Sequence, residues 1–198
     1  MMDPRDLWGL LGAALVLASG VLAVIPLKKT GPRWLLAIAL TGVAFLPLWK
    51  GLSSAAYLRG VIGDVSASTV MLATMYLFGG KGAKSNARDW FLGMILLSGL
   101  TLYPLSLGPF SIDPYQWGYQ PWGILAAIAF AGLVVLRGHP AAAYYLAFPV
   151  AAFALNLSWS RNLWDYLLDP LLFGYALIHL LHLVLRRSAP SEGRLFRN

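Results

Sequence analysis

The distribution of charge along the 198-residue chain constrains its fold more than any other sequence feature. Apolar stretches alternate with short charged connections, and lysine and arginine collect in every second connection. The apolar stretches cover residues 7–27, 34–49, 65–78, 90–107, 121–136, 141–157 and 167–185. This pattern predicts an all-α, polytopic transmembrane helix bundle of about seven crossings.

The charge difference between the two sets of connections predicts the orientation. One set holds eleven basic residues and two acids, a net charge of +9, whereas the other holds four basic residues and six acids, a net charge of −2. Because short loops rich in Lys and Arg stay in the cytoplasm, we assign the basic face to the inside. The amino terminus then lies outside and the carboxyl terminus lies in the cytoplasm. A six-crossing version, with both termini on one side, is the alternative.

The composition supports one membrane domain. With 59% hydrophobic and only 12% charged residues, the chain leaves no room for a soluble domain of ordinary size. We expect a single transmembrane domain over residues 1–187 and a short basic cytoplasmic tail over 188–198, in a bacterial cytoplasmic (inner) membrane. The basic residues flank apolar segments, so membrane lipids and not nucleic acids are the expected partners. The chain has no cysteine, which excludes thiolate metal sites and cysteine nucleophiles.

Two of the predicted crossings are short. Residues 34–49 end just after Pro47, and residues 65–78 fall below the usual ~17 to 25 residues of a crossing. The stretch that begins at Gly51 has the pattern of an amphipathic turn or short interfacial helix, which Gly60 and Gly63 should end.

Hydroxyl groups are concentrated in the third and fourth apolar segments. They belong to Ser66, Ser68, Thr69, Thr74, Tyr76, Ser98, Thr101, Tyr103 and Ser106. Two interpretations stay open: a polar path for a solute, or hydroxyls that bond to carbonyls one turn earlier on their own helix. No ionisable residue lies in the middle of any segment, which argues against a proton-coupled carrier.

The outer connections carry most of the carboxylates and tryptophans. One interpretation is an aromatic belt with an ion network that closes the mouth of the bundle. The other is a site for a partner or a polar ligand, such as a sugar or phosphorylated lipid headgroup, with aromatic rings as stacking walls. Asp165 and Asp169 are four residues apart, on one face of any helix that continues through them. The candidate binding residues are Arg59, Asp64, Asp113, Tyr115, Trp117, Trp159, Arg161, Asn162, Trp164, Asp165 and Asp169.

The three histidines lie toward the inner side and form a second candidate site. His179 and His182 are three residues apart, and His139 lies in a loop on the same side. Neutral imidazoles at this spacing can hold zinc or a similar ion, whereas the competing interpretation is a hydrogen-bonded or snorkelling pair. No cofactor is expected.

Three functional hypotheses follow. The first is an integral membrane accessory or interaction subunit of a bacterial envelope system, which holds a membrane or periplasmic protein partner or a lipid-linked ligand at its outer face. The second is a small permease or channel that uses the hydroxyls of the third and fourth segments. The third is a membrane enzyme acting on a lipid-linked sugar or phosphate. The enzyme is less favoured than a non-catalytic role, because no spacing brings the carboxylates to the ~5 to 9 Å that paired acid and base groups need.

Overall fold

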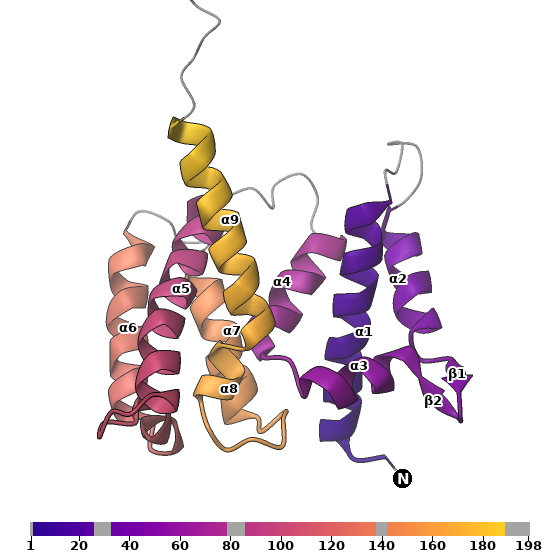
Figure 1. Cartoon of the computed structure of the whole chain (residues 1–198), viewed down its shortest axis with the longest axis horizontal. Helices are drawn as coiled ribbons and strands as arrows, with labels where there is room; N and C mark the ends of the chain where they lie inside the picture. Colours follow the sequence, from indigo (N-terminus) through magenta and orange to yellow (C-terminus); the bar gives the residue numbers. More distant parts are fainter. Residues whose placement is uncertain (1, 26–32, 79–85, 138–141, 189–198) are drawn as a thin grey trace, which may run out of the picture.

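The computed structural model describes residues 2–25, 33–78, 86–137 and 142–188, and this part of the chain is mostly helical (Figure 1). The helices are α1 (Pro4–Val24), α2 (Arg33–Val43), α3 (Ser54–Ile62), α4 (Ala67–Phe78), α5 (Asn86–Leu107), the 3₁₀ helix η2 (Pro114–Tyr119), α6 (Trp122–Leu136), α7 (Ala142–Ala154), α8 (Trp164–Leu167) and α9 (Pro170–Ser188). Two short strands, β1 (Pro47–Trp49) and β2 (Leu52–Ser53), form an antiparallel pair.

The longer helices stand side by side and alternate in direction. In Figure 1, α1, α2, α4, α5, α6, α7 and α9 run up and down in turn. The start of α1, the β1–β2 pair, α3, η2 and α8 therefore gather at the lower end of that view. We call this the loop end of the molecule. It carries the connections that the charge pattern assigns to the outside.

Two of the helices are long and apolar enough to cross a membrane. Within the described residues these are α1 and α5, by length and composition. The other apolar helices are shorter, at Arg33–Val43, Ala67–Phe78, Trp122–Leu136, Ala143–Ala154 and Pro170–Arg186. Helix length and composition therefore identify two candidate crossings among the described residues and do not confirm the predicted bundle of seven.

The second predicted segment differs most from the structure. Residues 34–49 were expected to form one crossing, but α2 ends at Val43 and the chain turns into β1 at Pro47. Proline has no N–H for the helix ladder, so it favours this ending. Lys50 and Gly51 then adopt positive φ angles of 48° and 75° and connect β1 to β2. The remaining predicted segments agree with the helices to within four residues at each end.

The short helix expected after Gly51 is present as α3. The Ser53 hydroxyl accepts a hydrogen bond from the N–H of Ala56, which caps the first turn. Gly63 ends the helix with φ 77°, a conformation that glycine adopts without strain, whereas Gly60 lies inside the helix and does not end it.

The core has two parts, which α4 joins. Apolar residues of α1, α2, α3 and α4 pack together, and a second cluster joins α5, α6, α7, α8 and α9. Ala67 of α4 packs with Ala152 of α7 and Tyr166 of α8 in a small cluster of its own. Helix α4 thus contacts both parts of the core, with α1 and α2 on one side and α7, α8 and α9 on the other.

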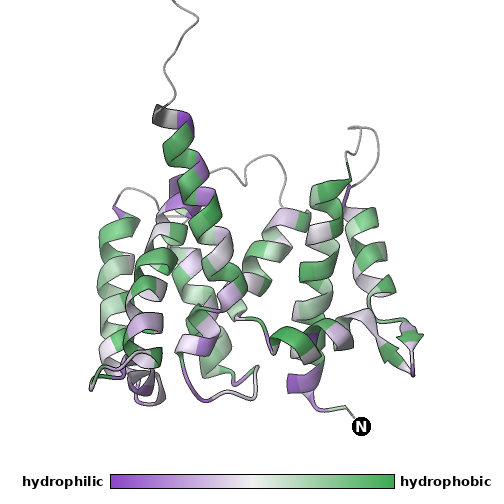
Figure 2. Cartoon of the chain, viewed as in Figure 1, coloured by the Kyte–Doolittle hydropathy of each residue, from purple (hydrophilic) through white to green (hydrophobic). Residues whose placement is uncertain are grey.

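Much of the outer surface of the helices is apolar. Figure 2 shows hydrophobic colours along the helices, with hydrophilic residues concentrated toward their ends. Helix α6 is the extreme case, because Ile124 is its only buried residue and Phe130 is 70% exposed. A helix that is apolar all round and exposed is typical of a surface covered by lipid or by another protein.

Candidate functional site

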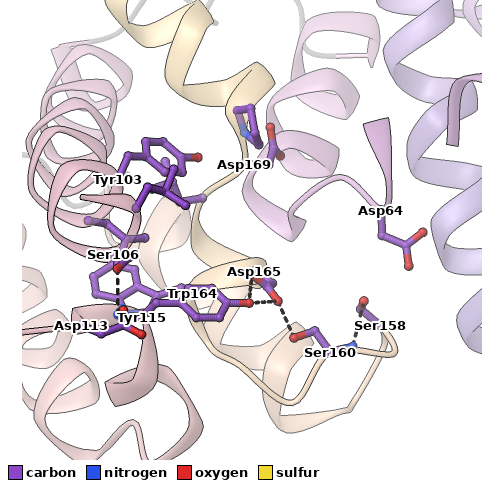
Figure 3. Close-up of a pocket in the computed structure, with 14 residues that line it drawn as sticks. Asp64, Tyr103, Ser106, Asp113, Tyr115, Ser158, Ser160, Trp164, Asp165 and Asp169 are labelled. Carbon is purple, nitrogen blue, oxygen red and sulfur yellow. Dashed lines mark hydrogen bonds between the residues drawn. The ribbon is translucent and has the colours of Figure 1, made fainter. Parts of the chain in front are cut away.

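A cavity of about 480 Å³ opens at the loop end (Figure 3). It lies between the end of α5, η2, the segment before α8, and the start of α9. The residues that line it are Asp64, Leu102, Tyr103, Ser106, Leu107, Asp113, Tyr115, Ser158, Ser160, Trp164, Asp165, Leu168, Asp169 and Pro170. Carboxylates, hydroxyls and aromatic rings thus share one cavity.

Asp165 lies on the wall that α8 contributes. Its carboxylate accepts hydrogen bonds from the Tyr115 hydroxyl at 2.9 Å and from the Ser160 hydroxyl at 2.6 Å (Figure 3). Burial, followed by the negative charge of Asp165, raises the pKa of Tyr115, so the phenol stays neutral and keeps donating. Both groups that hold Asp165 are therefore uncharged.

Asn162 joins the two segments that form this wall, η2 and α8. The side chain is fully buried, and its amide donates to the Tyr115 carbonyl at 2.9 Å while its Oδ1 accepts from the Trp164 N–H at 2.9 Å. The N–H of Leu163 also donates to the carbonyl of Gly118. A Cβ atom at Gly118 would lie 1.7 Å from Asn162 Oδ1, so only glycine permits this close approach of η2 to the segment before α8.

Asp169 forms the opposite wall and is 8% exposed. Its Oδ1 accepts from the N–H of Leu172 at 2.8 Å, which caps α9. Its Oδ2 accepts from the N–H of Ser66 at 2.8 Å and from the hydroxyl of Thr69. Because Ser66 in turn caps α4 through the N–H of Thr69, one carboxylate joins the first turns of two helices.

Asp113 shapes the third side of the cavity. Its side chain accepts from the N–H of Tyr115 at 3.0 Å and caps η2, whose first residue is Pro114. The Ser106 hydroxyl, at the end of α5, accepts from the same N–H at 3.3 Å. These bonds fix the main chain at Tyr115, whose hydroxyl donates to Asp165.

A group of charged side chains lies on the α1 side of the cavity, which one of its members, Asp64, lines. In this group, the Arg59 cluster, Arg59 pairs with Asp64 and also with Asp6 at 3.1 Å, and the indole N–H of Trp159 donates to Asp6 at 3.1 Å. The hydrogen bond to Asp64 raises the pKa of Arg59, so the guanidinium stays charged. A Cβ atom at Gly9 would lie 2.2 Å from Asp64 Oδ1, so this glycine makes room for the ion pair.

The structure brings together most of the predicted site residues. Arg59 and Trp159 lie beside the cavity in the Arg59 cluster, and Asn162 lies buried beneath it. Trp117 is exposed outside the cavity, as is Arg161, so neither lines it. The predicted residues that line the cavity are Asp64, Asp113, Tyr115, Trp164, Asp165 and Asp169.

Asp165 and Asp169 share the cavity for a different reason from the one expected. They do not lie on one helix face, because α8 ends at Leu167, Leu168 is extended, and α9 begins only at Pro170. A residue before proline is disfavoured in the helical region, which accounts for the break at Asp169.

Several cavity residues were absent from the predicted set. Tyr103 and Ser106 were noted only as hydroxyls of the fourth segment, although three-residue spacing places them on one helix face toward the loop end. Ser158 and Ser160 lie in irregular backbone, so their spacing in the sequence does not predict that their side chains line the cavity. Asp6, in the Arg59 cluster, was counted only as an outer charge.

Several hydroxyls of the third and fourth predicted segments have local or structural partners. Thr74 donates to the carbonyl of Val70 at 2.8 Å, and Thr101 donates to the carbonyl of Leu97 at 2.9 Å, each one turn earlier. Ser68 donates to the carbonyl of Tyr166. With Ser66 and Thr69 engaged around Asp169, these hydroxyls serve helix packing and capping.

The histidines do not form a three-residue site in the described part of the chain. His179 of α9 lies 3.0 Å from Asp89 of α5 and stacks on Tyr175, whereas His182 is exposed. The third predicted ligand, His139, lies outside the described residues. No group of three or more metal-ligating side chains occurs among the residues that are described.

No family model matches the chain, and no curated protein or solved structure matches it.

Proposed function

We propose that this protein is a multi-pass protein of the bacterial cytoplasmic membrane, with seven crossings and the loop end outside. Supporting this topology are the alternation of helix direction, the exposed apolar surface of α6, and the net charge of +9 that the sequence assigns to the opposite end. The helices shorter than a bilayer core are accommodated by local thinning of the bilayer or by flanking residues that reach the interface.

Within that topology, the protein is an accessory subunit that binds the polar group of a lipid-linked ligand, or of a membrane or periplasmic partner, in the cavity at the loop end. The observation that carries this proposal is the half-buried Asp165, which lines a cavity of about 480 Å³ together with the rings of Tyr115 and Trp164. A cavity of this size, with apolar walls and a few fixed polar groups, is typical of small-ligand sites.

The permease hypothesis has less support. It requires hydroxyls of α4 and α5 that are available to a solute, but Thr74 and Thr101 bond to their own helices and Thr69 bonds to Asp169. The enzyme hypothesis also has less support, because the other carboxylates of the cavity have structural partners. Asp169 caps two helices, Asp113 caps η2, and Asp64 pairs with Arg59.

The topology is tested by cysteine labelling, which is clean because the natural chain has no cysteine. Arg161→Cys at the loop end should react with a membrane-impermeant thiol reagent in intact cells. Arg137→Cys, which follows α6 at the opposite end, should react only after permeabilisation. Equal labelling of both variants in intact cells would disprove the proposed orientation.

Ligand binding is tested by purification in mild detergent followed by mass spectrometry of bound lipids and proteins. The wild-type protein should retain a stoichiometric lipid-linked molecule or partner that Asp165→Asn loses. Asp3→Asn is the matched control, because it removes the same charge at the same end while an asparagine still caps α1. An identical set of bound molecules in all three proteins would contradict the proposal.

A further inference from the structure

We propose that the cavity at the loop end accepts a positively charged amine or ammonium group. This inference rests on the proposed function, because it names the chemical class of the ligand for the same cavity. The sequence suggested a sugar or a phosphorylated lipid headgroup, and the cation proposed here was not among those candidates.

The charges around the cavity favour a cation. The described lining residues include four carboxylates, on Asp64, Asp113, Asp165 and Asp169, and no lysine, arginine or histidine. The guanidinium of Arg59, beside the lining residue Asp64, is already bonded to Asp64 and Asp6. A phosphate in this cavity would meet like charges without a basic group to bind it.

Asp165 is the anionic group best placed for a ligand. Asp169 is committed to the caps of two helices, and Asp64 is paired with Arg59. Among the described residues, Asp165 receives hydrogen bonds only from the neutral hydroxyls of Tyr115 and Ser160, and no basic side chain of this part of the chain lines the cavity. A partly desolvated carboxylate gains more from a cation than from another hydroxyl, because the Coulomb attraction grows as water is excluded.

The aromatic residues of the cavity suit the same ligand. The rings of Tyr103, Tyr115 and Trp164 line it together with the carboxylates (Figure 3). Trp164 is held in place because its indole N–H donates to the carbonyl of Pro114 at 3.0 Å. Faces of aromatic rings attract cations, and a set of rings with an acidic residue is a common means of binding ammonium groups.

The experiment titrates the detergent-purified full chain with four probes at equal ionic strength, by calorimetry and by thermal shift. The probes are choline, ethanolamine, glucose and inorganic phosphate. We expect choline or ethanolamine to bind and to raise the melting temperature, while glucose and phosphate have no effect. Binding of glucose or phosphate without either cation would overturn the cation assignment but keep the cavity as a ligand site. Binding of no probe would overturn the cation assignment, and the lipid and partner analysis would then decide the proposed function separately.

Two pairs of variants locate the bound cation. Asp165→Asn should weaken binding of the cation at least tenfold, whereas Asp3→Asn should leave it unchanged. If Asp165→Asn is poorly folded, Asp113→Asn and Ser160→Ala replace it: loss of the Asp113 charge should weaken binding, and Ser160→Ala should retain it because the Asp165 charge remains. Unchanged affinity in both carboxylate variants would place the cation elsewhere and overturn the proposal.

Discussion

Asp165 and Asp169 lie four residues apart and line the same cavity, yet they are held in different ways. Asp169 is buried, and main-chain N–H groups of Leu172 and Ser66 donate to it. Asp165 is half-buried, and within the described part of the chain its donors are the side-chain hydroxyls of Tyr115 and Ser160 alone.

The difference separates a structural carboxylate from one that is available to a ligand. Main-chain donors at helix starts need an acceptor whether or not a ligand is present, so Asp169 belongs to the fold. Side-chain hydroxyls orient the Asp165 carboxylate but do not satisfy its charge. The following predictions test this distinction, from the largest expected effect on stability to the smallest.

Asp169→Asn should have the largest effect. The amide NH₂ cannot accept the hydrogen bond of one of the two main-chain donors, and each charge-assisted bond lost costs about 1.5–3 kcal/mol. We expect a loss of about 3 kcal/mol in the free energy of unfolding, measured by denaturant titration in detergent micelles. A stability equal to that of the wild type would show that Asp169 is not the cap that joins α4 and α9.

Gly118→Ala should come second, by damaging the wall that holds Asp165. The added Cβ would approach Asn162 Oδ1 to 1.7 Å, so η2 must move away from Asn162. Forced overpacking of this kind costs about 1–3 kcal/mol. Gly123→Ala in α6 is the matched control, since nothing lies within 4 Å of its Cβ position. Equal melting temperatures for the two variants would contradict the close contact.

Tyr115→Phe should reduce stability less, by about 1 kcal/mol, because it removes one hydrogen bond to Asp165 and keeps the ring. Binding of a cation should survive in this variant, with a change in affinity smaller than that of Asp165→Asn. Tyr144→Phe, at a side chain that is 75% exposed, serves as the control for loss of a hydroxyl. A greater loss of affinity in Tyr115→Phe than in Asp165→Asn would assign the ligand to the phenol.

Asp165→Asn should have the smallest effect on stability, below about 1 kcal/mol, because its donors are hydroxyls that can turn to other acceptors. The same variant should have the largest effect on binding. Thermal unfolding of Asp165→Asn and Asp169→Asn in parallel checks the comparison directly. If Asp165→Asn were as unstable as Asp169→Asn, both carboxylates would be structural.

The sequence predicted the helices better than the ends of the helices. Apolar length and charge located each long helix, since these depend on residues near in sequence. After α2 ends at Val43, the chain enters β1 at Pro47 and turns at Lys50 and Gly51, where a non-glycine residue takes a positive φ angle that composition does not indicate. The expected crossing over 34–49 was therefore too long.

The candidate site was predicted in part for a similar reason. Carboxylates and rings in the outer connections were recognisable by type, and six of them line one cavity. The roles of Asn162 and Gly118 come from contacts between segments more than forty residues apart, as in the bond from Asn162 to the Tyr115 carbonyl, 47 positions away. Local spacing contains no information about such contacts, so the burial of Asn162 and its hydrogen bonds to η2 could not be predicted.

The bond from Trp159 to Asp6 has a consequence for the order of folding. It joins residues 153 positions apart, so it forms only after almost the whole chain has been made. Closing so long a loop costs conformational entropy, so contacts of this range form late in folding. Helices α1 to α4 can pack together while the ribosome is still adding the rest of the chain. The Arg59 cluster is complete only after the loop that carries Trp159 has been made. The cavity at the loop end, which residues as late as Pro170 line, is thus completed late in synthesis, and a chain truncated before the loop that carries Trp159 would lack it.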